Sequence, residues 1–589
     1  MMETTNLSKI RRDKMLNTIS EIKKTITDEK TLTNLSMIEN ELTKKKYGLI
    51  WEEHEERVDK ELETQIPTFE EIKDKEIVSN PNEKFNFLLE GDNLHSLYLL
   101  EKTHKEKIDV IYIDPPYNTG SKDFIYNDKY VDSENEYRHS KWLSFMDRRL
   151  KIAKSLLTEK GIIFISIDDN ELYTLKLLCD EIFGSINYIS TIVVESGEVF
   201  GTKATHANKT FVKVKDYVLV YTINKSLVNN KLPLYDSMNE LYDSHYNTIV
   251  DFDTMEKINI YDYLRSQKDM LKRININYDK LSASYINNTL KTNDAFKNYF
   301  YNELSKKLFT DQPLTKQIAS SFVNNMNSNN VYNYDGKLIF KTKTGSIRML
   351  QPYSNCLHIS DDYNCEYCRS SIRGDLWKNF HTDMRNIDDE GNVKFKSGKK
   401  PVRLIKQLIK WANISNGIVL DFFAGSGSTA QAVLELNKED DGNRQFILCT
   451  NNENNICEEI TYKRIKNVIT GYGKYNPLKS NLKYYRCAYI PRINTETENL
   501  HNNLLINIKN LIQLENGIEI DDNKIRVYLN EDELDRFSTN EKELEICEKI
   551  YISSDILLTS EQENIFENNN IEVYIIPEYY FEDEIMEVM

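Results

Sequence analysis

Residues 114–117, Asp-Pro-Pro-Tyr, combine groups that could hold a planar heterocycle carrying an exocyclic amine. The Asp114 carboxylate accepts hydrogen bonds, and the Tyr117 ring offers a flat stacking surface. Pro115 and Pro116 have no N–H, so this segment stops a strand and forms a rigid loop with available carbonyls. We predict that Asp114, Pro115, Pro116 and Tyr117 form a catalytic loop. The alternative is a simple Pro-Pro turn after a core strand.

The segment before this loop, residues 108–113, must position it. Its length and its β-branched residues are typical of a buried parallel strand. In open α/β sheets, ligands bind at the carboxyl ends of parallel strands. The strand is therefore expected to present the loop at the ligand-binding edge of a sheet.

A second motif starts with an apolar run that ends in Asp421 and continues into a turn containing Gly425 and Gly427. Glycine lets a backbone approach a ligand closely, and the helix predicted at 430–436 supplies free N–H groups at its N-terminus. No lysine follows the glycines, which disfavours a phosphate-binding loop. The motif predicts a nucleoside-binding turn or, alternatively, only a tight strand-to-helix connection. Its candidate binding residues are Asp421, Phe423, Ala424, Gly425, Ser426, Gly427, Ser428 and Thr429.

Together the two motifs resemble those of amino-group DNA methyltransferases. Residues 114–117 resemble the catalytic loop of the enzymes that methylate N6 of adenine, and the glycine turn resembles their S-adenosyl-L-methionine motif. The catalytic loop comes first, an order that resembles the circularly permuted beta group. The resemblance implies S-adenosyl-L-methionine as cofactor and a target-recognition domain between the two halves. It also implies a flipped adenine held by Asp114, the Pro115 carbonyl and Tyr117.

Further positions are candidates for donor binding. Asp92 follows a predicted strand and, by the same resemblance, contacts the adenine of the donor; it could equally cap the next helix. Lys400 and Pro401 open a helix and resemble an additional donor-pocket motif. The strand predicted at 446–450 lacks the final acid that holds the ribose in many methyltransferases, which leaves Glu453 as a nearby candidate.

Longer stretches resemble the modification subunit of type III restriction–modification systems, namely residues 90–120, 137–143, 165–170 and 451–457. This resemblance implies an enzyme that binds double-stranded DNA, forms a homodimer and recruits an ATP-dependent restriction (helicase–nuclease) subunit. An apolar patch at Leu49, Ile50 and Trp51 and an acidic C-terminal region give weak independent support for such partners. Open alternatives are an orphan adenine methyltransferase without a nuclease partner, a cytosine-N4 or RNA methyltransferase, and a non-catalytic DNA-binding subunit.

The alternation of strands and helices predicts an α/β fold with a parallel, Rossmann-like sheet. The resemblance implies that it is the sheet of S-adenosylmethionine-dependent methyltransferases. We expect an inserted recognition domain and five regions in all. They are a helical N-terminal segment (1–75), the catalytic half (76–225), the target-recognition domain (226–385), the donor-binding half (386–475) and an acidic C-terminal domain (476–589).

The distribution of charge supports this division. The chain of 589 residues has a net charge of −17, which is unfavourable for DNA binding as a whole. Residues 201–400 nevertheless hold 29 Lys and Arg against 22 Asp and Glu, whereas residues 501–589 hold 6 against 22. Phosphate binding needs only local positive charge, so the middle region is the predicted DNA reader. With no run of 18 apolar residues and no signal-peptide pattern, we expect a soluble, cytoplasmic bacterial protein with no membrane partner.

Four potential metal ligands, Cys356, His358, Cys365 and Cys368, lie within 13 residues. The last two have zinc-knuckle spacing, but no second matching pair exists. A structural zinc site and ordinary thiols in a loop are both compatible with this pattern, and we favour the thiols.

Overall fold

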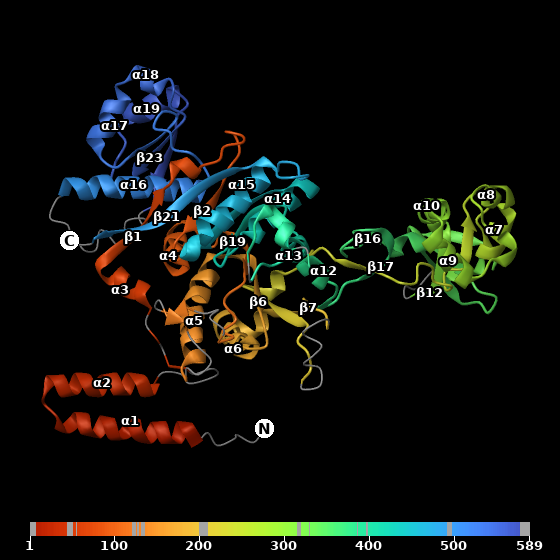
Figure 1. Cartoon of the computed structure of the whole chain (residues 1–589), viewed down its shortest axis with the longest axis horizontal. Helices are drawn as coiled ribbons and strands as arrows, with labels where there is room; N and C mark the ends of the chain where they lie inside the picture. The colour runs from red at the N-terminus through yellow and green to blue at the C-terminus, as the bar shows by residue number, and fades with distance from the viewer. Residues whose placement is uncertain are drawn as a thin grey trace.

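The structure is a computed structural model that describes residues 7–577, except 44–50, 53, 55, 121–124, 127–128, 131–135, 200–209, 315–319, 329, 386, 396–397 and 492–496. An α/β body carries an N-terminal helical pair, an elongated arm and a C-terminal domain (Figure 1). Of the predicted apolar patch only Trp51 can be placed, because Leu49 and Ile50 lie outside the described residues. Within the described part of the chain, no helix has the length and apolar character needed to cross a membrane.

A ten-stranded sheet forms the centre of the body. From edge to edge its strands are β1 (Gln65–Glu71), β21 (Asn481–Pro491), β2 (Phe85–Glu90), β20 (Asn443–Thr450), β19 (Asn416–Asp421), β3 (Ile108–Ile113), β6 (Leu157–Ile167), β8 (Lys215–Thr222), β7 (Tyr188–Glu195) and β18 (Leu376–Trp377). All neighbours from β21 to β6 are parallel, and β8 lies antiparallel between β6 and β7. The predicted Rossmann-like sheet is confirmed.

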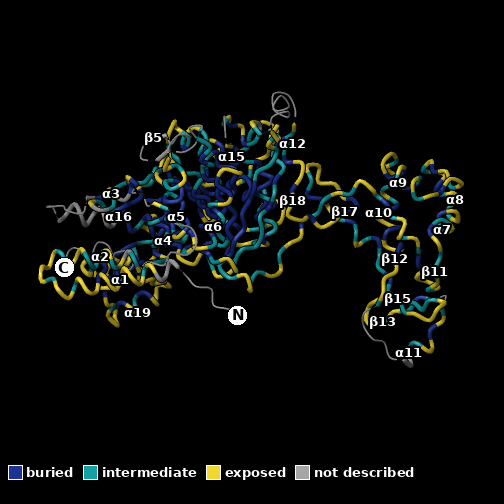
Figure 2. Tube along the Cα trace, turned by 90° about the horizontal axis from the view of Figure 1, so that it is seen from below, coloured by how far each residue is buried: buried dark blue, intermediate teal, exposed yellow. Residues whose placement is uncertain are grey.

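Helices cover both faces of this sheet. Successive residues of a strand point to opposite faces, so Ile111 and Ile113 pack in one apolar core while Val110 and Tyr112 pack in the other. The first core is covered by α4 (Asn93–His104), α5 (Arg138–Leu156), α6 (Leu172–Cys179) and α16 (Thr497–Asn516). The second is covered by α13 (Val402–Ala412), α14 (Ser428–Asp440) and α15 (Lys463–Thr470). Figure 2 shows the buried sheet at the centre of the body.

Strands β3 and β19 lie side by side although a long stretch of sequence separates them. Val110 pairs with Val419, and Ile111 pairs with Leu420, in parallel register. Parallel neighbours end at the same edge of a sheet. The permuted order of the two motifs therefore still brings the two loops together.

The arm, residues 248–352, projects away from the body (Figure 1). Its antiparallel sheet has the order β11 (Glu256–Asn259), β10 (Thr248–Asp251), β12 (Leu308–Pro313), β15 (Ile347–Pro352), β14 (Lys337–Lys341) and β13 (Val331–Tyr334). A separate apolar core holds the helices α7 (Ile260–Ser266), α8 (Lys268–Arg273), α9 (Ala283–Thr292) and α10 (Asp294–Asn302). A short helix α11 (Ser320–Asn324) follows, and the strands β9 (Tyr235–Ser237), β16 (Leu357–Ile359) and β17 (Tyr367–Ile372) connect the arm to the body.

The helices of the arm were not predicted. They are short, and their starts are marked only by polar caps: Ser282 accepts a hydrogen bond from the N–H of Tyr285, and Asn293 accepts one from Phe296. In a sequence rich in asparagine, such caps cannot be told from loop residues by type alone. Packing in the arm core decides that these segments are helical.

Smaller units stand at both ends of the chain. The N-terminal pair consists of α1 (Leu7–Thr25) and α2 (Glu29–Thr43), and α3 (Arg57–Thr64) leads into the sheet. In the C-terminal domain the parallel strands β22 (Ile525–Tyr528), β23 (Lys549–Ser553) and β24 (Glu572–Ile576) pack with α17 (Glu531–Ser538), α18 (Glu541–Leu544) and α19 (Ser560–Asn568). The remaining elements are β4 (Ile125–Tyr126), β5 (Lys129–Tyr130) and α12 (His381–Arg385).

Three predicted domain boundaries need correction. Strand β1 lies inside the segment predicted to be helical, β18 inside the predicted target-recognition domain and β21 inside the predicted acidic C-terminal domain, yet all three belong to the central sheet. The acidic, proline-containing sequence of β1 does not read as a core strand. It forms an edge strand instead, where proline is tolerated, and pairs antiparallel with β21.

Candidate active site

The predicted catalytic loop lies in the wall of a cavity of about 1420 Å³. Asp114, Pro115, Pro116 and Tyr117 follow β3 directly and all line this cavity. The phenol oxygen of Tyr112 lies 3.0 Å from the hydroxyl of Ser166, and both residues line the same wall. The Tyr117 hydroxyl is buried near the Asp114 carboxylate but meets no hydrogen-bond partner at good geometry among the described residues. The loop thus places an acceptor and an aromatic ring in the cavity wall.

Two residues that sequence reasoning did not identify hold this loop in place. The indole Nε1 of the fully buried Trp142 donates to the Pro116 carbonyl at 2.7 Å. The side-chain nitrogen of Asn118, a residue with φ of 56°, donates to the buried carboxylate of Glu171 at 2.5 Å. A buried polar group needs a partner, so these contacts fix the loop on both sides of Tyr117.

The electrostatics of Asp114 depend on Lys400. The Nζ of Lys400 donates to both carboxylate oxygens of Asp114, each at 2.8 Å, and lies 4.7 Å from the centre of the Tyr117 ring. Burial raises the pKa of the Asp114 carboxyl, and the neighbouring ammonium opposes this rise. Lys400 and Pro401 line the cavity, but among the described residues the Lys400 amine contacts the catalytic loop rather than the predicted donor turn at residues 421–429.

The donor turn emerges from the neighbouring strand and faces the same cavity. Asp421 accepts hydrogen bonds from the N–H of Phe423 at 3.0 Å and from the hydroxyl of Thr429 at 2.5 Å. These bonds tie the strand end to the start of α14. Burial raises the pKa of Asp421 to about 7. Of the predicted residues, those that line the cavity are Asp421, Phe423, Ala424, Gly425, Ser426, Ser428 and Thr429.

The two glycines of this turn have different roles. Gly425 has φ of +47°, and a Cβ placed there would find only the Phe423 carbonyl, at 3.8 Å, in an otherwise open cavity. Gly427 has φ of +75° and does not line the cavity; a Cβ there would lie 3.1 Å from the Thr461 side chain. Gly425 therefore keeps space for a ligand, whereas Gly427 permits close packing.

A buried arginine, also missed from the sequence, supports the turn from behind. Arg464 Nη1 donates to the hydroxyls of Ser428 at 2.8 Å and Ser426 at 3.2 Å. Its Nη2 lies 3.3 Å from the Glu390 carboxylate. Nothing in its local sequence distinguishes Arg464 from a surface arginine of an amphipathic helix, so only the fold reveals this role.

Asp92 caps a helix and also lines the cavity. Its carboxylate accepts a hydrogen bond from the N–H of Leu94 at 2.8 Å, which caps α4, and the half-exposed side chain lines the cavity. Arg149 lies 3.4 Å from Asp92 and is held by the Glu56 carboxylate at 2.7 Å. Glu453 also lines the cavity, in a short 3₁₀ turn just after β20. Both acids thus stand where they could meet a donor.

The four cysteine and histidine side chains of the possible zinc cluster have separate neighbours. The His358 ring stacks on the Tyr235 ring, with 3.7 Å between the two ring centres. Cys356 Sγ lies 3.1 Å from the Tyr246 hydroxyl. Cys365 is exposed and Cys368 is buried. Among the described residues, the ligand atoms of these four side chains do not gather within the span of one metal site; Glu71, Glu76 and Glu519 do, around the Lys483 amine.

Comparison with known proteins places this architecture in a family. The Mod subunit of the type III restriction-modification enzyme EcoPI, from Escherichia phage P1, is 32% identical over 466 residues, which cover 72% of this chain and 66% of that protein. The probable HindVI Mod subunit of Haemophilus influenzae is 29% identical over 406 residues, which cover 66% of this chain and 51% of that protein. The chain thus spans about half to two thirds of the length of these two relatives.

A further relative, the type II methyltransferase M.KpnI of Klebsiella pneumoniae, is 30% identical over 382 residues, which cover 63% of this chain and 82% of that protein. The resemblance to type III modification subunits seen in the sequence is confirmed. A family model described as DNA methylase matches residues 108–463, more than half of the chain. Because this match includes both the Asp-Pro-Pro-Tyr loop and the glycine turn, the chain belongs to the DNA methylase family.

Proposed function

We propose that this chain is a site-specific DNA methyltransferase that transfers a methyl group from S-adenosyl-L-methionine to N6 of a flipped adenine in double-stranded DNA. The observation that carries the proposal is the meeting of residues 114–117 and 423–425 in one cavity, at the ends of adjacent parallel strands. The first loop suits an amino-substituted base, and the second offers an open glycine turn at a helix start. At about 1420 Å³, the cavity has room for two ligands of nucleoside size.

The donor side fits S-adenosyl-L-methionine. Gly425 leaves open space that a side chain would fill, Phe423 lines the same cavity, and the carboxylates of Asp92 and Glu453 could accept hydrogen bonds from amine or hydroxyl groups. We assign donor binding to these residues together with the start of α14. When bound, the cofactor supplies a methyl group on a positively charged sulfur.

The residues of the catalytic loop would activate the base by position and charge. Taking an adenine out of the duplex costs a few kcal/mol, and stacking on Tyr117 offsets about 1–3 kcal/mol of that cost. The N6 lone pair is delocalised into the ring. Asp114 and the carbonyl of Pro115 would accept its two N–H groups and favour a lone pair directed at the donor turn. Trp142 already occupies the Pro116 carbonyl. As N6 forms its bond to the methyl carbon, the carbon–sulfur bond breaks and the electron pair stays on sulfur, while N6 releases one proton to the solvent.

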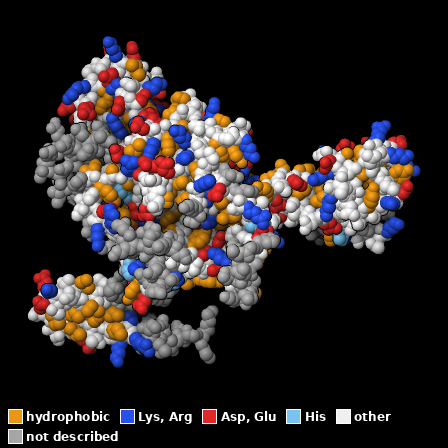
Figure 3. Space-filling view, in the orientation of Figure 1, with side chains coloured by type: hydrophobic (Ala, Val, Ile, Leu, Met, Phe, Trp, Pro, Cys, Tyr) orange, Lys and Arg blue, Asp and Glu red, His pale blue; other side chains and the backbone are white. Residues whose placement is uncertain are grey.

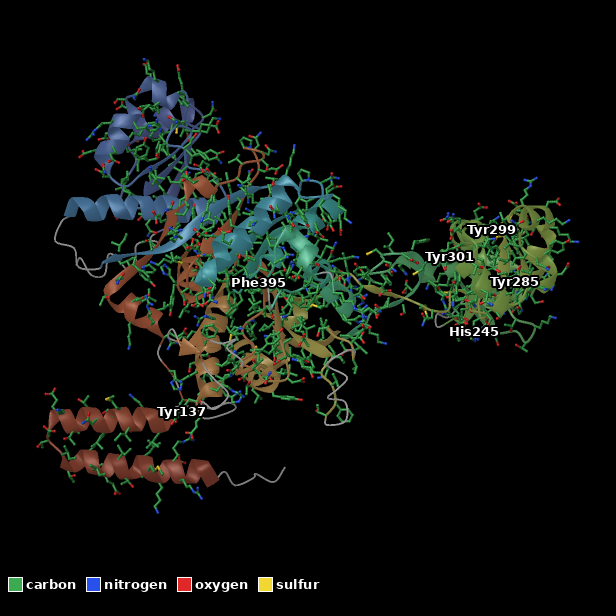
Figure 4. The ribbon with its side chains drawn as sticks, viewed as in Figure 1. Tyr137, His245, Tyr285, Tyr299, Tyr301 and Phe395 are labelled. Atoms are coloured by element: carbon green, nitrogen blue, oxygen red, sulfur yellow. The ribbon has the colours of Figure 1, made fainter. Side chains whose placement is uncertain are left out.

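The arm is the proposed reader of the DNA sequence. It belongs to a region with a positive charge balance, and its position far from the body leaves its surface open to a duplex. Figure 4 shows Tyr285, Tyr299 and Tyr301 in the arm, well away from Phe395, which lines the cavity. Since Tyr301 is buried in the arm, only the exposed polar and charged residues there are proposed to contact DNA.

Single-molecule sequencing tests the proposal most broadly. The chain is expressed alone in cells that lack DNA methylation, and an Asp114→Ala variant serves as the background control. We expect N6-methyladenine at one sequence context in DNA from cells with the wild-type chain. N4-methylcytosine at a defined context, modification confined to RNA, or unmodified DNA would each contradict the proposal.

As modification and recognition subunit of a type III system, the chain is also proposed to form a homodimer. The distance between arm and cavity in Figure 4 would allow one protomer to read the DNA that the other methylates. The N-terminal pair offers a contact surface: Met15, Ile22, Met37 and Ile38 are 38–63% exposed on two helices linked by the Lys23–Glu39 ion pair. Figure 3 shows apolar side chains gathered on this pair.

Light scattering at micromolar concentration tests the dimer. We expect twice the chain mass of 69.3 kDa for wild type and a shift toward one chain mass for a Met37→Glu, Ile38→Lys double variant. Leu557→Glu, at an apolar residue that is 82% exposed in the C-terminal domain, is the matched control and should stay dimeric. A fully active wild-type protein with the mass of one chain contradicts the dimer.

Recruitment of an ATP-dependent restriction subunit is tested separately, by co-purification of an ATPase that cleaves unmethylated DNA.

A further inference from the structure

The contacts of Lys400 reproduce those proposed for the target amine. Its ammonium donates N–H groups to both oxygens of Asp114 and lies over the face of Tyr117. These are the acceptor and the aromatic surface that an adenine N6 and its ring require. Both the lysine and the aspartate side chains are about 15% exposed, so little room remains for a second amine at the same place. Lys400 and the base therefore compete for one position.

We propose that Lys400 is a positioning residue of methyl transfer: its ammonium holds the Asp114 carboxylate over Tyr117 and yields this place to the amine of the incoming base. The inference rests on the proposed function and adds a step to it, an exchange of one N–H donor for another. A carboxylate left alone in this cavity would be a costly unpaired charge. The exchange avoids that state, because one donor replaces the other.

The backbone of Lys400 links this exchange to the donor side. Its carbonyl accepts a hydrogen bond from the Ser428 hydroxyl at 2.9 Å, and Ser428 belongs to the donor turn at the start of α14. Pro401 follows and caps α13 with an extended backbone. The main chain at residue 400 is therefore fixed, while the long side chain can turn aside. Departure of the ammonium needs rotation about side-chain bonds only.

The charges around Asp114 decide what removal of Lys400 would do. The groups that face this carboxylate are the Lys400 ammonium, the Asp216 and Asp421 carboxylates and the phenols of Tyr112 and Tyr117. Among the described groups that face Asp114, Lys400 is the only cation. Without it, burial and the two acids would raise the pKa of Asp114 further. Protonated Asp114 could not accept the target amine in the same way, so activity should then require a higher pH.

The test compares Lys400→Met with wild type in two measurements. In the pH profile of kcat/KM for DNA, we expect the acid limb to move up by about 1–3 pH units. In DNA carrying 2-aminopurine next to the target adenine, we expect stronger fluorescence at pH 8.5, because the competitor for the adenine amine is gone and the adenine leaves the stack more often. Lys400→Arg keeps the charge and should retain the wild-type acid limb. Lys406→Met removes a lysine of α13 that contacts Glu439 of α14, outside the cavity, and is the control.

The outcomes separate this inference from the proposed function. If wild type transfers no methyl group to adenine, the proposed function itself fails. If wild type is active but Lys400→Met has the same pH profile and the same fluorescence, the positioning role is refuted. Loss of all transfer at every pH in Lys400→Met, with a normal melting temperature and normal donor affinity, would also refute it, since a residue that yields its place is not needed at high pH.

Discussion

Two aspartates end neighbouring strands of the sheet and border one cavity, yet their surroundings differ. Asp114 is paired with the ammonium of Lys400, whereas Asp421 meets the hydroxyl of Thr429 and the N–H of Phe423. Burial raises the pKa of both carboxyls, to about 7 for Asp421. A cation opposes the rise at Asp114, while only neutral donors oppose it at Asp421.

The difference indicates separate tasks for two similar strand ends. The partners of Asp421 are fixed by the backbone of its own turn, so this residue shapes the donor loop. The partner of Asp114 is a flexible side chain from a distant segment, which can leave without disturbing the fold. A carboxylate with an exchangeable partner suits a substrate, and one with fixed partners suits a scaffold. Variants in the two halves of the cavity should therefore lose different properties.

The largest expected effect on the donor half comes from Gly425→Val. A β-branched residue with positive φ costs about 1–3 kcal/mol, and its side chain would project into the cavity. We expect the affinity for S-adenosyl-L-methionine in calorimetry to fall about 100-fold or more. Gly473→Val is the matched control, because Gly473 has φ of +53° and open space but lies outside the cavity. Unchanged donor affinity in Gly425→Val would place the donor elsewhere.

A moderate effect on the base half is expected from Trp142→Phe. The variant keeps a buried ring but loses the 2.7 Å hydrogen bond to the Pro116 carbonyl. A loosened catalytic loop should lower kcat by about 10- to 100-fold, since small misplacements of reacting groups are costly. Donor affinity should stay as in wild type. Trp377→Phe loses a comparable bond to the Gly374 carbonyl at the edge of the sheet and should keep its kcat. Equal losses in both variants would argue against a specific role of Trp142.

The smallest effect, on stability alone, is expected from Asp421→Asn. The pKa of this carboxyl rises from 3.8 to about 7 on folding, so its ionisation costs stability as the pH rises through 7. The asparagine variant avoids this cost and can still pair with Phe423 and Thr429. At pH 8.5 the variant should melt at a higher temperature than wild type, by about 2–4 °C for each kcal/mol gained in the free energy of unfolding. This difference in melting temperature should shrink at pH 5. A difference that is independent of pH would contradict this account.

The sequence predicted the two loops because their signals are local. Apolar strands that end in Asp-Pro-Pro-Tyr or in a glycine turn can be recognised without knowledge of the fold. Lys400 was assigned to the donor, because its contact with Asp114 spans 286 positions. Trp142, Glu171 and Arg464 gain their roles only through packing against these loops. The helices of the arm were missed for the same reason, since their short apolar patterns become clear only in the arm core.

The most direct test of separate tasks is to measure donor affinity and methyl transfer together in Asp114→Ala. Calorimetry should give a dissociation constant for S-adenosyl-L-methionine within about twofold of wild type, because donor residues such as Gly425 are untouched. Incorporation of tritiated methyl groups into DNA should be lost, by at least about 1,000-fold, as expected when an interaction specific to the transition state disappears. Transfer at wild-type levels, or a parallel loss of donor affinity, would contradict the account.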